Sequence, residues 1–219
     1  MPATVDQLTL GPLGTNCYLV RAERGAVEAV VVDPSGTAAE IRLALASHGA
    51  RCAGILVTHG HFDHILGLAD LAEGTGASVY APAGERALLE QPSSFTPPGV
   101  AVRPWTADTF LVGGESLELA GLRIQVRAVP GHSPGHLAYA VGEALFSGDV
   151  LFAGSVGRTD FPGGDWQTLV GSIRMLVDSF PPDTVVYPGH GPATTLGEEL
   201  ARNPFLAELR DERRGEAAG

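Results

Sequence analysis

The residues best suited to chemistry form one short run, Thr58-His59-Gly60-His61-Phe62-Asp63-His64, which follows an apolar stretch and precedes a segment of helical pattern. In an extended chain alternate side chains point the same way, so His59 and His61 face one side. Asp63 and His64 follow where the chain turns into the helix. Burying four such side chains together would be costly without a cation, and imidazole and carboxylate are the ligands that zinc prefers in catalytic sites. The run therefore predicts a metal centre.

Three further candidates each follow a glycine at the end of an apolar, strand-like segment. His132 follows 122–129, Asp149 follows 144–147 and His190 follows 184–187. Loops at strand ends are where rigid folds carry catalytic groups. Five of the 7 histidines fall in these places or in the first run. Five histidines and two aspartates are enough to hold two metals, with one carboxylate bridging them.

Other polar residues receive structural interpretations. His48, near a helix end, is expected to be exposed, and His136 is expected to support its loop rather than bind metal. Asp160 and Asp165 are assigned turn and cap roles. The cysteines, Cys17 and Cys52, lack zinc-finger spacing and are expected to be buried thiols.

The pattern of apolar residues predicts strands and helices in both halves of the chain. Strands are expected at 17–20, 29–32, 54–57, 122–129 and 184–187, with a hairpin formed by 137–141 and 144–147. Helices are expected at 35–49, at 65–73 with Gly74 as its stop, from Asp165 to Phe180, and in the tail from Leu196. The proline-rich segment 91–109 is interpreted as a surface loop that joins the two halves. Two packed sheets with helices outside would accommodate this order.

Composition restricts the kinds of partner. Net charge is −11, with no basic footprint for a nucleic acid, and no apolar run is long enough to span a membrane. All 14 basic residues are arginine, so a catalytic lysine is excluded. We expect a cytoplasmic protein that acts on a small molecule; the sequence leaves its oligomeric state open.

Together these residues resemble the metallo-β-lactamase superfamily, whose signature is His-x-His-x-Asp-His followed by a distant His, Asp and His. The resemblance covers the chain from about Cys17 to Phe205. It implies an α/β (α+β) fold, a four-layer αββα sandwich in a single domain (1–219), with the metal site at the sheet edge. It also implies two zinc ions, with iron or manganese as alternatives. By position, His59, His61 and His132 would bind one metal, Asp63, His64 and His190 would bind the second, and Asp149 would bridge them.

Within the superfamily, residues 154–165 (GSVGRTDFPGGD) and 203–206 (NPFL) resemble glyoxalase II. That resemblance implies hydrolysis of S-D-lactoylglutathione, or of a related glutathione thioester, by a hydroxide that bridges the metals. Asp63 and Asp149 would orient the metals and the hydroxide. Arg158 would either grip a glutathione carboxylate or brace its loop by pairing with Asp160. The bridging aspartate argues against a true β-lactamase.

Two departures put tight glutathione recognition in doubt. Only 29 residues follow His190, too few for the helical domain that helps glyoxalase II bind glutathione, and Gly191-Pro192-Ala193 replaces its usual acidic residue and tyrosine. Three alternatives stay open. One is a persulfide dioxygenase with a single iron, although Val156 stands where that family typically carries a cysteine. The others are a zinc lactonase or esterase, and a binding module without activity.

Overall fold

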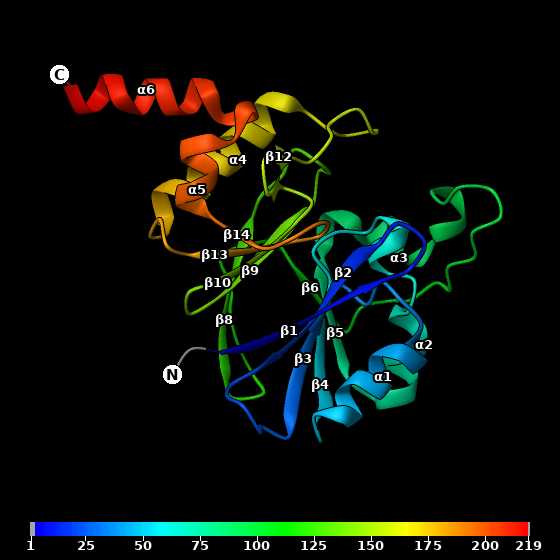
Figure 1. Cartoon of the computed structure of the whole chain (residues 1–219). Coiled ribbons are helices and arrows are strands. Elements are labelled where there is room, and N and C mark those ends of the chain that lie inside the picture. Colours follow the sequence, from blue (N-terminus) through cyan, green and yellow to red (C-terminus); the bar gives the residue numbers. More distant parts are fainter. Residues whose placement is uncertain (1–2, 219) are drawn as a thin grey trace.

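Two six-stranded sheets form the centre of the computed structural model, which describes residues 3–218 (Figure 1). The first sheet keeps the order of the chain, and its strands are antiparallel from β1 to β3 and parallel from β3 to β6. Its strands are β1 (Thr4–Leu10), β2 (Thr15–Arg21), β3 (Glu28–Val32), β4 (Arg51–Leu56), β5 (Ser78–Pro82) and β6 (Thr109–Leu111).

The second sheet has the order β14-β13-β10-β9-β8-β7, in which only β10 and β13 are parallel neighbours. Its strands are β7 (Ser116–Leu119), β8 (Leu122–Ala128), β9 (Leu137–Val141), β10 (Ala144–Gly148), β13 (Val185–Pro188) and β14 (Thr194–Thr195). A small ribbon joins β11 (Leu151–Phe152) to β12 (Ser155–Val156). The helices are α1 (Ala38–Ser47), α2 (Leu68–Thr75), α3 (Arg86–Glu90), α4 (Trp166–Ser179), α5 (Leu196–Arg202) and α6 (Ala207–Ala218).

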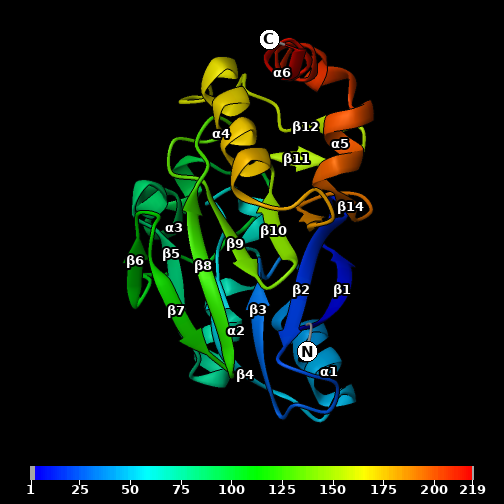
Figure 2. The ribbon, with the colours of Figure 1, turned by 90° about the vertical axis from the view of Figure 1, so that its left-hand side faces the viewer.

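Three apolar layers hold these elements together. Between the sheets, residues such as Tyr18 and Val30 pack against Ile124 and Phe146 of the second sheet. Outside the first sheet, β2 to β5 pack against α1 and α2, and outside the second, α4 and α5 cover β9, β10 and β13, with α6 lying on α4 and α5 (Figures 1 and 2). The predicted four-layer αββα sandwich is confirmed. Along the part of the chain described, no helix is both long and apolar enough to cross a lipid bilayer.

Local signals explain most elements. Strand β8 alternates buried and exposed residues along most of its length, as its sequence predicts. Helix α1 begins with a capping box between Thr37 and Glu40, and α4 begins at Asp165, whose side chain accepts a hydrogen bond from Thr168 N. The predicted hairpin is β9–β10, which turns at Gly142. The predicted elements include no counterpart of α3 or of seven strands, namely β1, β5, β6, β7, β11, β12 and β14.

Two predictions are wrong, one about where a helix ends and one about which segment joins the two halves. Helix α2 continues past Gly74 to Thr75 and ends at Gly76, whose φ of 70° is the left-handed cap conformation. The segment 91–109 does not join the two halves. It joins α3 to β6 within the first-sheet half, and the chain crosses to the second sheet in the short turn between Leu111 and Ser116.

The carboxyl ends of several strands meet at one edge of the sandwich. In the first sheet β3 and β4 are parallel; in the second, β8, β10 and β13 run in one direction. Backbone hydrogen bonds join the sheets at this edge, from Leu137 N to Thr58 O (2.8 Å) and from Asn16 N to Gly189 O (2.7 Å). The loops after these strands are thus held against one another.

A pair of glycines tests how tightly this edge is packed. A Cβ at Gly131 (φ 133°) would lie 2.3 Å from Leu169 N of α4, whereas around Gly142 (φ 57°) no described atom lies within 4 Å of such a Cβ. Both positive φ values are unfavourable for alanine, at a cost of about 1–2 kcal/mol. Gly142→Ala should lose about that much unfolding free energy in urea, and Gly131→Ala about 3 kcal/mol or more because of the added clash. Equal losses would show that α4 is not packed as described.

Candidate metal centre

All seven residues that the sequence predicts to bind metal lie together at the edge of the sandwich where the strand ends meet. They come from the loop after β4, the loop after β8, and the ends of β10 and β13. In each of three groups, one ligating atom per residue lies within 4.8 Å of the others; the groups are His59, His61 and His132; His59, His64 and Asp149; and Asp63, His64 and His190.

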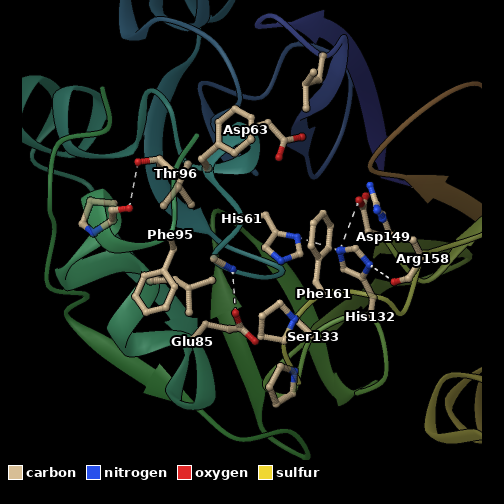
Figure 3. A pocket seen from close by; sticks show the side chains of 18 of the residues that line it. His61, Asp63, Glu85, Phe95, Thr96, His132, Ser133, Asp149, Arg158 and Phe161 are labelled. Carbon is tan, nitrogen blue, oxygen red and sulfur yellow. Dashed lines mark hydrogen bonds and ion pairs between the residues drawn. The ribbon is translucent and has the colours of Figure 1, made fainter. Parts of the chain in front are cut away.

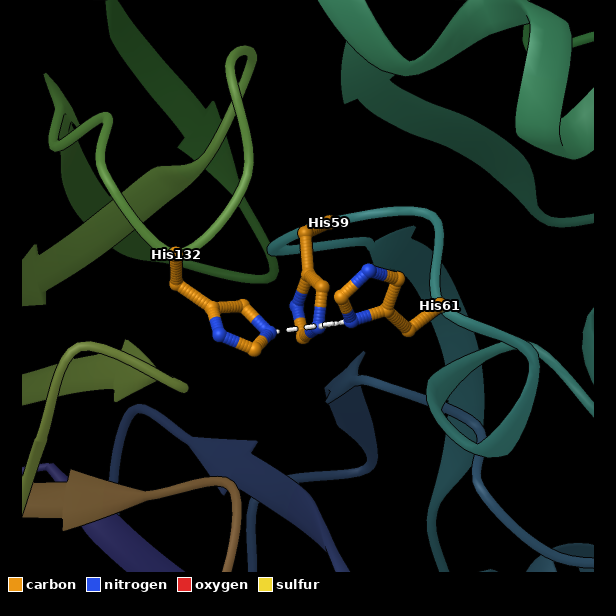
Figure 4. A group of neighbouring side chains, drawn as sticks. All are labelled: His59, His61 and His132. Carbon is orange, nitrogen blue, oxygen red and sulfur yellow. Dashed lines mark hydrogen bonds between the residues drawn. The ribbon is translucent and has the colours of Figure 1, made fainter. Parts of the chain in front are cut away.

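The first group consists of three imidazoles whose nitrogens converge (Figure 4). His61 Nδ1 lies 3.1 Å from His59 Nε2 and 2.9 Å from His132 Nε2. The outer nitrogen of His132, Nδ1, donates to the carbonyl oxygen of Arg158 over 2.7 Å, which directs Nε2 toward the other two rings. Three nitrogens with lone pairs facing one point are the donor set of a catalytic zinc site.

The second group combines two imidazoles with a carboxylate. Asp63 Oδ2 lies 3.3 Å from His190 Nε2 and 3.6 Å from His64 Nε2. Thr15 Oγ1, at the start of β2, donates to the same oxygen over 2.6 Å and fixes the carboxylate in place. This arrangement needs the first sheet's β2 and the second sheet's β13 side by side.

Asp149 lies between the two groups. Its Oδ2 is 3.7 Å from His132 Nε2 in the first group and 3.6 Å from His190 Nε2 in the second, and its Oδ1 is 3.4 Å from His64 Nε2. One carboxylate therefore reaches ligating atoms of both groups, as a bridging ligand must.

Two buried atoms show that this donor set fits a metal. Among the described residues, His64 Nε2 and Asp149 Oδ1 are fully buried and have no hydrogen-bond partner. An unpaired polar atom in the interior is expensive, and two of them facing each other call for a cation between them.

The pKa values point the same way. Burial lowers the pKa of His59 well below its ordinary value and that of His61 to about 4. Burial by itself would raise the pKa of Asp63 and Asp149. The contact with His190 and the charge of His64 bring Asp63 to about 2, and the charge of His64 also holds the pKa of Asp149 below its ordinary value. At neutral pH the carboxylates are ionised and these two imidazoles are neutral, as metal binding requires.

The pKa of His64 shifts in the opposite direction from those of His59 and His61. Burial lowers it, but the charges of Asp149 and Asp33 outweigh burial and raise it well above its ordinary value. In the absence of a metal, a proton on His64 balances the buried carboxylates. A divalent cation would take over that balance, so metal binding at this group releases a proton.

Asp33 is a functional residue that the sequence analysis missed. It directly follows β3 with φ 51°, is 2% exposed, and accepts hydrogen bonds from Thr58 N (2.7 Å), Thr58 Oγ1 (2.7 Å) and His64 Nδ1 (2.9 Å). It therefore places the proton of neutral His64 on Nδ1 and leaves Nε2 for a metal. An aspartate at the end of an apolar strand, Val30-Val31-Val32-Asp33, was the available signal.

Glu85 is a second residue that was missed. It is fully buried and accepts from Gly60 N (3.3 Å) and from Gly135 N (2.8 Å). Its two oxygens thereby join the loop of His61 to the loop of His132, and Figure 3 shows Glu85 with one of these hydrogen bonds. No sequence pattern near Glu85 predicts these hydrogen-bond partners.

Glycines flank the ligating residues because the site has no room for a Cβ. At Gly189 it would lie 2.1 Å from Asp149 Oδ1, at Gly148 2.5 Å from Thr58 Oγ1, and at Gly60 2.6 Å from Leu88 Cβ. The glycine before each ligating residue at a strand end is thus a packing requirement of the site.

The other polar residues have the structural roles that the sequence predicted. His136 accepts from Asp149 N and stacks on the ring of His59, which is the supporting role expected. His48 is exposed, and the two cysteines are free and buried. Arg158 pairs with Asp160 through two hydrogen bonds of 2.5 and 2.6 Å, so the loop-bracing contact is present.

A cavity of about 710 Å³ opens onto the site. Its lining includes His61, Asp63, His132, Asp149 and His190, so members of both groups face it. Small-molecule sites are cavities of this size class with a few convergent polar groups.

Comparison with known proteins shows similarity to one superfamily along most of the chain. The profile of the metallo-beta-lactamase superfamily matches residues 10–190. A probable metallo-hydrolase of Bacillus subtilis is 35% identical over 205 residues, which cover 91% of this chain and 96% of that protein. A hydroxyacylglutathione hydrolase of Haemophilus influenzae is 34% identical over 204 residues, covering 87% of this chain and 92% of that protein.

Solved structures show the same similarity. The crystal structure of the BLEG-1 B3 metallo-beta-lactamase superposes with a TM-score of 0.87 at 38% identity, covering 93% of this chain and all (100%) of that one. The crystal structure of TTHA1623 in a di-iron-bound form superposes with a TM-score of 0.72 at 39% identity, covering 92% of this chain and 100% of that one.

Asp33→Asn tests the support of the second group. If the asparagine keeps its amide oxygen toward Thr58 N, its NH₂ group faces His64 Nδ1. Nδ1 must then accept a hydrogen bond, so the proton of the neutral ring lies on Nε2, the nitrogen that would bind the metal. We expect the affinity for zinc to fall about 10- to 100-fold, measured by competition with a chromophoric chelator, with the fold retained. Asp183→Asn, on an exposed carboxylate between α4 and β13, is the control. Unchanged zinc affinity in Asp33→Asn would show that Asp33 does not set the tautomer.

Proposed function

The chain belongs to the metallo-beta-lactamase superfamily, and from that premise we propose that it is a two-metal hydrolase that cleaves thioesters. The superfamily and its metallo-hydrolase members support a metal-dependent hydrolase. The two-metal count, the ligand assignments and the thioester specificity are the parts that we propose.

The geometry supports an assignment of every ligand. The first metal would be held by the three convergent imidazoles and the second by the histidine pair with its carboxylate, with Asp149 shared. Zinc suits nitrogen and carboxylate donors, and so does iron, for which the di-iron form of TTHA1623 is a precedent. First-metal ligands are His59, His61 and His132; second-metal ligands are Asp63, His64 and His190.

Bound at these positions, two cations would polarise the substrate carbonyl and bring the pKa of a bound water down to about 7. The chain's own residues prepare the site for this chemistry. Asp63, fixed by Thr15, and Asp149 both line the cavity and are ionised, so they are placed to orient the attacking water.

The observation that carries the thioester proposal is the lack of a free general acid. Every described titratable side chain that lines the cavity is either in the ligand set or already engaged: Glu85 with two backbone amides, and Arg158 with Asp160. A poor leaving group such as an amine needs a proton as it departs, whereas a thiolate leaves as an anion. Thioesters therefore match this cavity better than amides, and S-D-lactoylglutathione is the reference substrate because the Haemophilus relative is named a hydroxyacylglutathione hydrolase.

The second candidate activity is β-lactam hydrolysis, which the similarity to the BLEG-1 enzyme favours. A β-lactam nitrogen must be protonated or otherwise stabilised when the ring opens. The same leaving-group comparison therefore separates the two candidates.

Metal content tests the ligand assignments. Purified protein loaded with zinc should hold about two metal ions per chain by elemental analysis. His132→Ala and His190→Ala should each retain about one, and Asp149→Ala, which removes the shared ligand, should hold neither tightly. His48→Ala, on an exposed histidine outside the site, should keep both. One tightly held iron in the unmodified protein would reject the two-metal assignment.

Leaving-group preference tests the reaction. For one acyl group, hydrolysis of the thioester should exceed that of the matching amide by more than the difference in their uncatalysed rates, by about 100-fold or more, since an amide lacks the general acid that it needs. Release of thiol or amine with time is the measurement, and a β-lactam is run beside the pair. Efficient amide or β-lactam turnover with a slow thioester would overturn the proposal.

A further inference from the structure

The walls of the cavity differ from its floor in chemistry: most of the charged groups lie at the metal centre, and the walls are largely apolar. Large apolar side chains reach it from five separate segments, namely Leu13, Leu88, Phe95, Phe152 and Phe161. In Figure 3, Phe95 lies on the other side of His61 from Asp149 and Arg158. Much of the cavity is therefore lined without any group that could pair with a substrate charge.

Several of these wall residues are exposed to solvent although they are large. Leu13 is 57%, Phe95 54% and Phe161 40% exposed. Apolar side chains that converge around a cavity and remain in contact with water are a common sign of a binding surface. They would be covered by a substrate that brings apolar surface of its own.

The lining of the cavity carries little positive charge. Arg158 is the one basic residue among the described residues of the lining, apart from the histidines, and its Nε and Nη2 already donate to Asp160. Its Cζ also lies 4.3 Å from the centre of the Phe161 ring. A glutathione thioester carries two carboxylates, so this cavity offers it one arginine that is already paired.

We propose that the cavity selects thioesters with a bulky apolar group, in preference to S-D-lactoylglutathione, and that Phe95 is a specificity-determining residue. The inference rests on the proposed thioester hydrolysis and narrows its substrate class. Contact with Phe95 is made away from the reacting carbonyl, so it stabilises bound substrate and transition state alike. Its effect belongs in KM rather than in kcat.

Three probes separate the contributions of the acyl group and the thiol. They are S-D-lactoylglutathione, S-hexanoylglutathione, and the hexanoyl thioester of N-acetylcysteamine, which has no carboxylates. The inference predicts a kcat/KM about tenfold higher for hexanoyl- than for lactoylglutathione, the order of effect expected for burying an apolar chain. It also predicts no loss when the neutral thiol replaces glutathione.

Phe95→Ala supplies the second measurement on the zinc-loaded enzyme. The ratio of kcat/KM for hexanoyl- over lactoylglutathione should fall about tenfold, through KM. Phe205→Ala is the matched control, since Phe205 is 50% exposed but does not line the cavity. Circular dichroism and zinc content confirm that each variant is folded and loaded.

The outcomes distinguish this inference from the proposed function. Thioester cleavage that favours S-D-lactoylglutathione, or a Phe95→Ala variant with an unchanged ratio, would overturn the apolar selection and leave thioester hydrolysis standing. Absence of hydrolysis with all three thioesters would overturn both.

Discussion

The arrangement of this molecule depends on one constraint: five imidazoles and two carboxylates are brought together, and all of them except His61 and His190 are buried. Ionised carboxylates and unpaired imidazole nitrogens are costly in such a place, and divalent cations are the natural compensation. Each ligating residue follows a strand, and none could move far, because a Cβ on Gly60, Gly131, Gly148 or Gly189 would meet another atom at 2.6 Å or less. The loops are short and tightly packed because the donors must converge.

The ligating residues converge because loops from both sheets meet at one edge of the sandwich. Neither sheet carries a complete site: the first supplies the run from His59 to His64 and its supports Thr15 and Asp33, and the second supplies His132, Asp149 and His190. Backbone hydrogen bonds across the edge hold the halves in register. Confining charge to this floor, beneath apolar walls, also strengthens its electrostatic action on a bound carbonyl, since few competing dipoles lie nearby.

The sequence predicted the parts of this account that have local signals. The run around His59, the glycine-led strand ends, the capping box of α1 and the alternation of β8 are all short-range patterns, and the elements that they predicted are present. Strand β7 was missed although Ser116–Leu119 alternates polar and apolar residues between Gly114 and Gly121, whereas β6, with three residues, is too short to show such a pattern. Asp33 and Glu85 were missed for another reason. Their partners lie 25 or more residues away, so their roles exist only once the chain has folded.

The central claim is that two metals share this edge, one in each group, with Asp149 between them. The most direct test is anomalous X-ray diffraction at the zinc absorption edge from crystals of the zinc-loaded protein. The account predicts two anomalous peaks per chain about 3.5–4 Å apart, one beside His61 and His132 and the other beside Asp63 and His190, with Asp149 in contact with both. A single peak, or a pair of peaks that Asp149 does not join, would contradict it.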